Sequence, residues 1–518
     1  MSRWPQVLLN KSVYPHPVDH LQLIETHISW VVLTGTFAYK IKKPVNLGFL
    51  DFTTLEQRRH YCLRELELNR RFSKKLYLDV VPVTGSREYP VIDGDAEVID
   101  YAVKMRQFDN SLLADSLARQ HRLSDELVRK MAKTLASFHR ELPAVDQATA
   151  SGFAQRFFSA ATQNFSQVRE YPLPQEIEQA LQACEKWTLS SYQQCLPLMR
   201  SRQREGYIKD CHGDCHLGNI AVIDGEVTLF DCIEFNDDFR IMDTMAEAAF
   251  LSMDLCARGL AEQSQRFLND YLEYRGDYSA LPLLDLFRCY YALVRAKVNL
   301  MQEPAAGHPG INRETHSEFY RYLALAQQFT TSKAPVMVLM HGYSGSGKSY
   351  LAERLAVQTG AIRIRSDVER KRLYGLLPEQ SGDSVPELYS REASRRTFKR
   401  LLQQSATIMA AGFPCIVDAT FLTESSRHPF VEYATGNNIP LLIVHCVASE
   451  EATVERLARR EQSGRDPSDA GVDVYRRQKG SADTFTNEEQ LHVLVIDTER
   501  GNGVESAVAR LQQVAAQS

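Results

Sequence analysis

The chain has 518 residues, of which 44% are hydrophobic and 24% are charged, and its formal net charge is −5. We expect two or more domains, because a single hydrophobic core stops growing at about 250–300 residues. The small negative charge argues against a protein built mainly to coat nucleic acid or an acidic membrane, although it leaves room for local basic patches.

We expect neither a signal peptide nor a membrane-spanning helix in this sequence. No apolar run approaches the roughly 20 residues that a membrane-spanning helix needs. The first ten residues lack the long apolar segment and the small-residue cleavage site of a signal peptide. The 10 cysteines are scattered without framework spacing, which is typical of reduced thiols. We therefore expect a cytoplasmic protein that does not associate with membranes.

Residues 25–45 are rich in β-branched and aromatic side chains and predict strands joined by tight turns. Lys40 follows Ala38 with the spacing of the kinase lysine that grips the α- and β-phosphates of ATP. Lys42 is the alternative, because side chains two residues apart point to the same face of a strand. A basic edge strand without nucleotide contacts would carry the same pattern.

A helix is predicted over residues 54–72, and Glu65 and Glu67 on it are the acids that could pair with Lys40. Residues 98–108 predict a strand that leads into a hinge between two lobes, where backbone groups would meet an adenine. A further helix is predicted over residues 124–142, since Ser124 can cap it and acidic residues follow in its first turn. Other helices follow over residues 168–200.

The most specific pattern of the first 330 residues begins at His212. Asp214 comes two positions later, Asn219 follows after five more, and Asp231 ends an apolar run. Asp214 can accept a proton from a hydroxyl group, while Asn219 and Asp231 can hold magnesium against the phosphates of ATP. The pattern therefore predicts a phosphoryl-transfer site.

Thiols and imidazoles also cluster in this stretch, which raises the alternative of a zinc site. The candidates are Cys211, His212, Cys215, His216 and Cys232. Structural zinc sites need a second pair of ligands with matching spacing, and the sequence has none. Zinc is therefore disfavoured.

The His212 pattern resembles the aminoglycoside phosphotransferase and choline kinase branch of the protein-kinase-like fold, over about residues 20–325. The resemblance implies a bilobal α+β domain, with Asp214 as catalytic base, Asn219 and Asp231 as magnesium ligands, and His212 as a support for the loop. One feature of that branch is missing, because no glycine-rich loop lies near the front of the chain. Residues 26–29 or 33–37 would have to cover the phosphates.

The same resemblance selects Glu65, rather than Glu67, as the partner of Lys40. It also implies that Asp243 braces the active-site loop. Other charged residues of this region identify no substrate, and we expect them to be surface charges or salt-bridged helix residues: Glu247, Asp254, Arg288, Arg295 and Lys297.

Residues 331–335 form a short polar linker with a proline stop, which separates an expected first domain, residues 1–330, from a second, residues 336–518. A buried strand predicted over residues 336–340 runs directly into the sequence Gly-x4-Gly-Lys-Ser, with a helix after it. Its backbone N–H groups would cradle phosphates, Lys348 would reach the β- and γ-phosphates, and Ser349 would bind magnesium. The expected nucleotide-binding residues are Gly342, Ser344, Gly345, Ser346, Gly347, Lys348 and Ser349.

Two more predicted strands of the second domain, residues 361–365 and 413–417, end in acidic residues. Ligands bind at the carboxyl edge of open α/β sheets, so Asp367 is a candidate to orient or deprotonate an acceptor hydroxyl. Asp418 is a candidate to hold magnesium through water. Purely structural roles are the alternative for both. Strands over residues 441–447 and 491–496 complete an expected parallel sheet of five strands.

Residues 456–465 contain many arginines, which a lid needs to stabilise charge on the transferring phosphoryl group. Arg456 and Arg460 are the first candidates, and a solvated helix face is the alternative. The second domain resembles P-loop small-molecule kinases related to gluconate kinase, zeta-toxin-like and polynucleotide-kinase-like proteins. The motifs that carry this resemblance lie at residues 342–349, 366–367, 417–420 and 456–465.

The whole chain resembles bacterial fusions of an aminoglycoside phosphotransferase-like domain and a P-loop kinase domain of the AAA family ATPase type. This predicts two centres, each using ATP and Mg²⁺ to phosphorylate a small hydroxylated molecule. A second hypothesis makes the P-loop domain a kinase of nucleotide-sugars or nucleic-acid 5′-hydroxyls, for which the basic helix over residues 390–409 is the best patch. A third makes one domain a nucleotide-binding regulator of the other.

Overall fold

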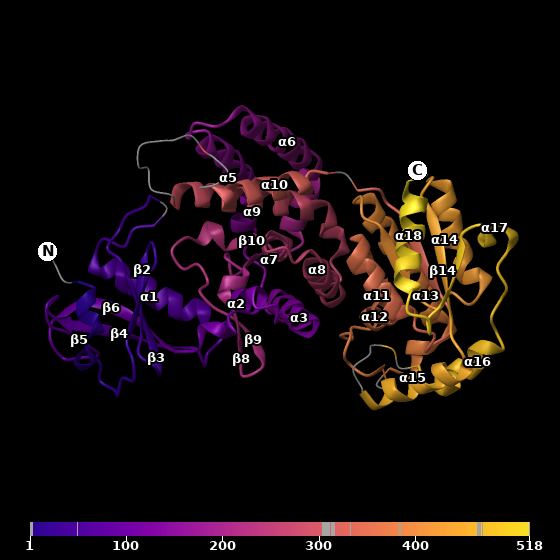
Figure 1. The fold of residues 1–518 in the computed structure, drawn as a ribbon, viewed down its shortest axis with the longest axis horizontal. Coiled ribbons are helices and arrows are strands. Elements are labelled where there is room, and N and C mark those ends of the chain that lie inside the picture. Colours follow the sequence, from indigo (N-terminus) through magenta and orange to yellow (C-terminus); the bar gives the residue numbers. More distant parts are fainter. Residues whose placement is uncertain are drawn as a thin grey trace. The chain divides into compact units, whose positions relative to one another are not determined.

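The structure is a computed structural model that describes residues 4–48, 50–302, 311, 316–331, 333–382, 385–463, 468 and 470–516 (Figure 1). Packing divides the chain into two compact units. The first unit comprises residues 1–134, 138–167 and 192–254, and the second comprises residues 135–137, 168–191 and 255–518. The predicted linker at 331–335 includes Ser332, which lies outside the described residues. The domain boundary stays a prediction.

The first unit begins with an antiparallel sheet of six strands in the order β1-β2-β3-β6-β4-β5. The strands are β1 (Gln22–Glu25), β2 (Ser29–Leu33), β3 (Phe37–Lys42), β4 (Tyr77–Gly85), β5 (Pro90–Ile92) and β6 (Val98–Arg106). On β3, the alternation of side chains places Tyr39 and Ile41 in a buried cluster on one face. Lys40 and Lys42 point to the other face, toward α1 (Leu55–Asn69), which a capping box at Thr54 and Gln57 starts.

Helices and two small sheets make up the remainder of the first unit. The helices lying wholly or partly in it are α2 (Ala114–Arg119), α3 (Asp125–Glu141), α4 (Gln147–Ser151), α5 (Phe153–Val168), α6 (Gln175–Arg204) and α7 (Thr244–Ala257). The small sheets pair β7 (Ile208–Asp210) with β10 (Ile241–Asp243), and β8 (Ile220–Ile223) with β9 (Glu226–Leu229). Ser124 caps α3 as predicted, because its side chain accepts a hydrogen bond from Leu127 N–H.

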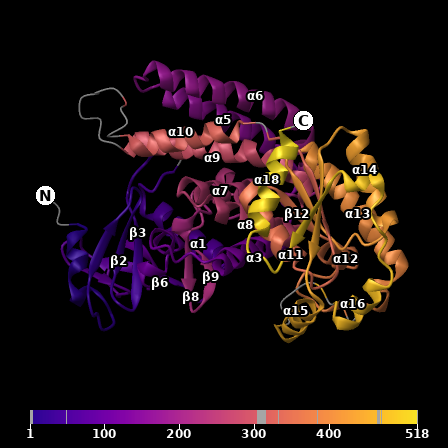
Figure 2. The ribbon, with the colours of Figure 1, turned by 45° about the vertical axis from the view of Figure 1, so that its right-hand side comes forward.

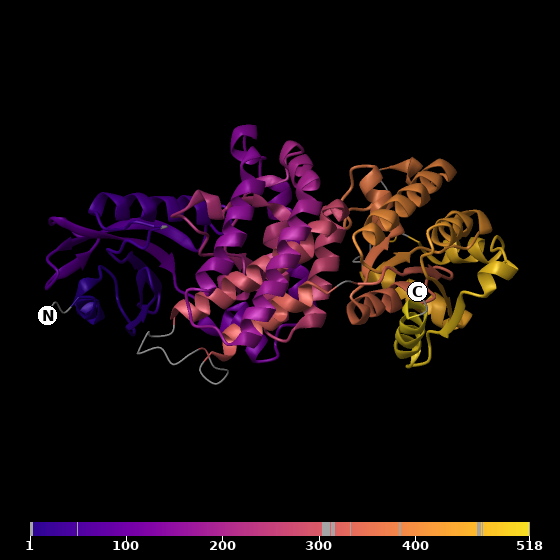
Figure 3. The ribbon, with the colours of Figure 1, turned by 90° about the horizontal axis from the view of Figure 1, so that it is seen from above.

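The second unit contains a parallel five-stranded sheet in the order β12-β13-β11-β14-β15, which confirms the predicted P-loop fold. Its strands are β11 (Met337–His341), β12 (Ile362–Arg365), β13 (Cys415–Asp418), β14 (Leu441–Val447) and β15 (Val493–Asp497). On one face lie α11 (Lys348–Thr359) and α18 (Gly503–Ala515), and on the other α13 (Arg391–Ala410) and α14 (Glu424–Gly436) (Figures 2 and 3).

The other helices of the second unit are α8 (Ala261–Arg275), α9 (Leu281–Gln302), α10 (Ser317–Phe329), α12 (Ser366–Leu373), α15 (Glu450–Ser463), α16 (Val472–Lys479) and α17 (Asn487–Gln490). The 3-10 turns of both units are η1 (Gln6–Leu9), η2 (Lys11–Val13), η3 (Asn110–Leu112), η4 (Leu217–Asn219), η5 (Asp237–Phe239), η6 (Tyr278–Ala280) and η8 (Pro386–Tyr389).

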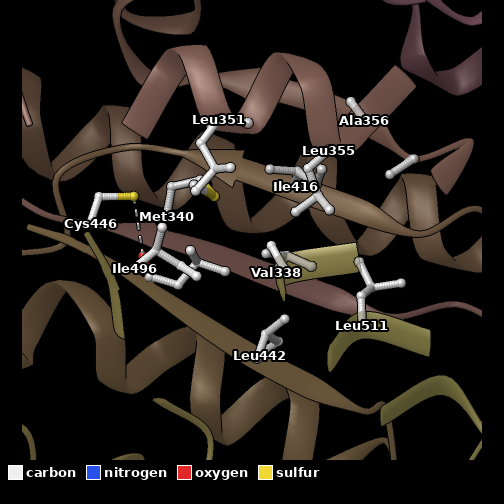
Figure 4. Packing of buried hydrophobic residues seen from close by; sticks show 14 of the residues in the cluster. Val338, Met340, Leu351, Leu355, Ala356, Ile416, Leu442, Cys446, Ile496 and Leu511 are labelled. Carbon is white, nitrogen blue, oxygen red and sulfur yellow. Dashed lines mark hydrogen bonds between the residues drawn. The ribbon is translucent and has the colours of Figure 1, made fainter. Parts of the chain in front are cut away.

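The sheet of the second unit rests on an apolar cluster that fixes the start of α11 (Figure 4). Val338 and Met340 on β11 pack with Leu351 and Leu355 on α11, and all four are nearly or fully buried. Because β11 and α11 flank the loop at 342–347, this packing holds both ends of that loop. Within the described parts of the chain, no helix is both long enough and apolar enough to cross a bilayer.

Candidate active sites

The first candidate site forms where β3 meets α1 and the end of β9. Lys40 Nζ lies 2.9 Å from Glu65 Oε1, and it is also paired with Asp231. Burial acts to lower the pKa of Lys40, but the carboxylates of Asp231 and Glu65 outweigh it and raise that pKa well above its usual value. Lys40 therefore stays charged in a site that strands and helix position independently of any ligand. Glu67, the rejected alternative, is exposed and pairs with Arg64 on its own helix.

Lys42 occupies a second, deeper position of the same cluster. Its Nζ lies 2.7 Å from Glu65 Oε2 and is also paired with Glu234, and the Lys42 side chain is completely buried. Burial alone would raise the pKa of Glu65, but Lys40 and Lys42 together lower it to about 2. Each oxygen of Glu65 thus takes one lysine, and Lys40 is the lysine that also reaches the partly exposed Asp231.

Asp214 and Asn219 lie side by side at the start of the β8–β9 hairpin. Asn219 Nδ2 donates to Asp214 Oδ2 at 2.9 Å and to the Asp214 carbonyl at 3.0 Å. His216 Nε2 lies 3.4 Å from the same carboxylate oxygen, and the Asp214 side chain is 37% exposed. Asp214 is therefore fixed in direction yet open to an incoming hydroxyl group.

The β8–β9 hairpin also carries the two predicted magnesium ligands. Phe230 N–H donates to the Asn219 carbonyl at 3.1 Å, which places Asn219 and Asp231 at the same end of the hairpin. Asp231 adopts a left-handed backbone with φ of 62°, and its N–H donates to the Tyr77 hydroxyl. Amide and carboxylate oxygens are the hard ligands that Mg²⁺ prefers, so these residues fit the ion.

His212 ties the Asp214 loop to the end of β9. Its Nδ1 accepts a hydrogen bond from Asp214 N–H at 3.3 Å, so the proton belongs on Nε2, which contacts the Phe230 carbonyl at 2.8 Å. Burial lowers the pKa of this imidazole and so favours the neutral form that the two contacts require. His212 is thus a support of the loop in this structure.

Two buried carboxylates of α7 hold the backbone of the same loop. Gly213 N–H donates to Glu247 Oε1 at 2.7 Å, and Leu217 N–H donates to Asp254 Oδ2 at 2.9 Å. Glu247 and Asp254 are each only 1% exposed, so the expectation that they are surface charges is wrong. The signal available in the sequence was their position within an otherwise largely apolar helix.

Asp243, expected to brace the loop, has other partners. Its two carboxylate oxygens accept from Arg202 at 2.7 and 2.8 Å, and both side chains are buried. Asp243 ends β10, whereas Glu247 and Asp254 lie on α7 and accept hydrogen bonds from the N–H groups of the loop. His139 Nε2 contacts Glu247 Oε2 at 2.8 Å, and the His139 side chain is fully buried, so this histidine is a structural residue.

The second candidate site is the loop between β11 and α11. Gly342 has φ of 143°, and a Cβ there would lie 2.6 Å from the Cys446 carbonyl, so only glycine fits. Lys348 Nζ donates to the Tyr343 carbonyl at 3.2 Å and thus folds back over the loop. Burial lowers the pKa of Lys348, while the nearby Asp418 and Asp367 act to raise it.

Ser349 and Asp418 meet at the carboxyl edge of the sheet, as their predicted roles require. Ser349 Oγ donates to Asp418 Oδ1 at 3.0 Å. Asp418 Oδ2 is buried and accepts no hydrogen bond from any described residue. A hydroxyl oxygen and a carboxylate oxygen that accepts no hydrogen bond within the described part of the chain, both near a helix N-terminus, are ligands that fit Mg²⁺ bound to a nucleotide. Asp367 lies in the first turn of α12, at the end of the neighbouring strand β12.

The two candidate lid arginines of helix α15, Arg456 and Arg460, have different surroundings. Arg456 donates to the Thr498 hydroxyl at 2.9 Å and to its carbonyl at 3.1 Å, and Thr498 in turn donates to the Ser346 carbonyl. Arg456 therefore supports the loop from the β15 side. Arg460 lies close enough to Lys348 to help lower its pKa. Arg465 and its neighbours at 464–467 lie outside the described residues.

Sequence reasoning missed one contact of the P-loop. Ser344 N–H donates to Gln478 Oε1 at 2.8 Å, and Gln478 Nε2 is 3.2 Å from Ser344 Oγ. Tyr475, one turn earlier on α16, packs edge-on against Tyr343. No motif marked Gln478, because its role depends on α16 folding back onto a loop 134 residues away.

Comparison with known proteins gives one family match around each candidate site. Residues 63–284 match the phosphotransferase enzyme family, and residues 337–485 match a family described as AAA domain. The uncharacterized protein Rv2004c of Mycobacterium tuberculosis is 30% identical over 454 residues, which cover 86% of this chain and 88% of that protein.

Two solved structures are among those that match parts of the chain. A choline/ethanolamine kinase family protein from Mesorhizobium loti covers 61% of this chain and 94% of its own, at 11% identity and a TM-score of 0.36. A gluconokinase from Sinorhizobium meliloti 1021 covers 36% of this chain and 96% of its own, at 21% identity and a TM-score of 0.26. By its relationship to Rv2004c, the chain belongs to that protein's family, and its phosphotransferase and P-loop kinase-like domains make it a kinase.

Proposed function

We propose that the chain is an ATP- and magnesium-dependent phosphotransferase with two nucleotide-binding centres, each acting on a hydroxyl group of a small molecule. One observation supports this proposal: each candidate site brings together, from its own residues, a lysine and side-chain oxygen atoms, the groups that would hold phosphate and magnesium. In the first site these are Lys40 with Asp231. In the second they are Lys348 and the Ser349–Asp418 pair.

In the first centre, Asp214 takes the proton of the acceptor hydroxyl as its oxygen attacks the γ-phosphorus of ATP. The new oxygen–phosphorus bond forms while the bond from the γ-phosphorus to the bridging oxygen breaks, and ADP leaves. Lys40, oriented by Glu65, holds the α- and β-phosphates. Asn219 and Asp231 would hold Mg²⁺, which would supply positive charge to offset the charge of the phosphates.

In the second centre, the loop amides and the N-terminus of α11 receive the phosphates, and Lys348 turns from the Tyr343 carbonyl to the nucleotide. Ser349 and Asp418, which are hydrogen-bonded to each other, would hold the magnesium ion. Asp367 orients or deprotonates the acceptor hydroxyl, and Arg460 offsets charge on the transferring phosphoryl group. Both centres work by positioning and charge neutralisation, which is what phosphoryl transfer demands of a protein.

The test separates the two centres by single substitutions in the full-length chain. Wild type, Asp214→Ala and Lys348→Ala are incubated with γ-labelled ATP and a small-molecule extract of cells, and labelled products are resolved. Each variant is expected to lose a different phosphorylated product. Asp95→Ala and Lys399→Ala, both at exposed positions, are the matched controls and should lose none.

If Asp214→Ala and Lys348→Ala leave every labelled product unchanged, the proposal of two centres is refuted. Label that appears only as free phosphate in all samples refutes transfer to an acceptor. It favours the alternative in which a nucleotide-binding domain acts as regulator.

A cytoplasmic location is part of the proposal. All 10 cysteines of the chain are free thiols, and nine of them are buried. Buried free thiols without disulfide partners suit a reducing compartment.

A further inference from the structure

The edge strand of the P-loop sheet is covered by side chains of α8. β12 is the outermost strand of the sheet, so one side of its backbone has no partner strand. Asn269 fills that side: its Oδ1 accepts from Arg363 N–H at 2.7 Å, and its Nδ2 donates to the Ala361 carbonyl at 3.1 Å. Gln265, one turn earlier, donates to the same carbonyl at 2.8 Å. The amide of Asn269 thus pairs with the strand as another strand would.

These two elements come from different family matches. α8 lies within residues 63–284, which match the phosphotransferase enzyme family, and β12 lies within residues 337–485, which match the AAA domain. Both belong to the second compact unit, and Figure 2 shows α8 beside α11 and β12. Part of the phosphotransferase match is therefore packed into the body that carries the P-loop.

Glu273 extends this contact by one more turn of α8. Its Oε2 lies 3.2 Å from Arg363 Nη2, and its Oε1 lies 3.2 Å from Arg365 Nη1. Arg363 and Arg365 are two residues apart on β12, so both point to the same face of the strand. The three side chains are 5 to 13% exposed, and ion pairs so shielded from water are screened little by salt.

Arg365 connects Glu273 to the proposed magnesium ligand. In the parallel pairing of β12 with β13, Arg365 stands directly beside Asp418. Arg365 Nε lies 3.8 Å from Asp418 Oδ2, which is close enough for attraction but too long for a hydrogen bond. Asp418 Oδ2 is the buried oxygen that accepts no hydrogen bond from the described residues. The Arg365 guanidinium group thus lies between two carboxylates, closer to Glu273 than to Asp418.

We propose that Glu273 is a positioning residue of the P-loop site: by holding Arg365 it leaves Asp418 available to the magnesium ion of the bound nucleotide. The inference rests on the proposed function, since it presumes that this site binds a magnesium–nucleotide complex. Without Glu273, Arg365 closes on Asp418 and competes with the cation. One part of the phosphotransferase match thereby sets the cation affinity of the P-loop centre.

The experiment measures nucleotide binding rather than activity. Binding of a fluorescent ATP analogue is titrated with MgCl2 in the full-length chain, and the component lost in Lys348→Ala is assigned to the P-loop site. Glu273→Gln is expected to raise the half-saturating Mg²⁺ concentration of that component about fivefold or more, the scale of typical couplings between sites. Arg266→Gln removes another ion pair of α8, to Glu353 on α11, and should change it less than about twofold.

Two further variants keep the test decisive. Glu273→Asp retains the charge and is expected to stay close to wild type, which guards against a failure of Glu273→Gln to fold. In an Arg365→Gln background, Glu273→Gln should have no further effect, because the competing cation is gone.

The inference is overturned if Glu273→Gln and Arg266→Gln shift the Mg²⁺ dependence equally, or if the Glu273→Gln effect persists in the Arg365→Gln background. A wild-type chain without any Lys348-dependent component refutes the proposed P-loop site itself, and this inference with it.

Discussion

Lys40 and Lys42 stand two residues apart on one strand, and their substitution by methionine is expected to have different consequences. The Lys42 side chain is fully buried, as are Glu65 and almost all of Glu234, its two partners. Asp231, by contrast, the partner that only Lys40 reaches, is 42% exposed. Lys42→Met therefore leaves buried carboxylates short of a cation. Lys40→Met also leaves a carboxylate without its cation, but this carboxylate, Asp231, is partly in contact with water. The same substitution removes the proposed phosphate ligand.

The size of the effect follows from the charge balance around Glu65. The two lysines lower its pKa from 4.5 to about 2, and at about 1.4 kcal/mol per unit this corresponds to roughly 3 kcal/mol in favour of the charged form. Breaking a buried pair by removing one partner typically costs about 3–5 kcal/mol. We expect Lys42→Met to lower the free energy of unfolding of the first unit by this amount, and Lys40→Met by less than about half of it.

Urea unfolding followed by tryptophan fluorescence measures this directly. The chain has 3 tryptophans, and in a Trp187→Phe background the remaining two, Trp4 and Trp30, pack against each other beside the N-terminal sheet. Lys74→Met, at an exposed position, is the control and should stay within about 0.5 kcal/mol of the parent. Equal destabilisation by Lys40→Met and Lys42→Met, or a Lys42→Met curve that overlays the control, would refute the reasoning.

Three other outcomes are expected. Glu247→Ala removes the acceptor of Gly213 N–H and should lower turnover at the first centre at least about tenfold. Turnover at the P-loop centre should not change, and a phosphorylation assay that resolves the products of the two centres measures both. Gln478→Ala removes both contacts to Ser344 and should raise the apparent Kd of the P-loop site for ATP several-fold. An unchanged affinity would contradict a role for α16 in nucleotide binding. Because the folded-state pKa of Glu65 is depressed to about 2, its stabilising contribution is full above about pH 4.5 and is lost as the pH falls toward 2. Acid titration of tryptophan fluorescence should therefore show Lys42→Met unfolding at higher pH than its parent.

Local signals were sufficient for most of the architecture. Two local signals predicted the parallel sheet and the sequence positions of its strands. These are the glycine-rich loop between an apolar strand and a helix, and the acidic residues at strand ends. Ser124 and the acids after it predicted the start of α3 correctly. The strand spacing of Lys40 and Lys42 correctly predicted that both point to one face, where they share Glu65.

Tertiary partners were beyond the reach of local patterns. Nothing near Asp243 indicates that Arg202, 41 residues earlier, takes its carboxylate and leaves the loop to Glu247 and Asp254. The contact of Asn269 with β12 likewise joins residues more than 90 positions apart. Such pairings depend on how helices pack, and a charged residue in a helix carries little mark of its eventual partner.

The stoichiometry of magnesium–ATP binding tests the central claim most directly. Calorimetric titration of the full-length chain should give two nucleotides per chain. Lys348→Ala and Lys40→Ala should each retain one, and the double variant should retain none. A wild-type chain that binds a single nucleotide, or single variants that both still bind two, would contradict the account of two separate centres.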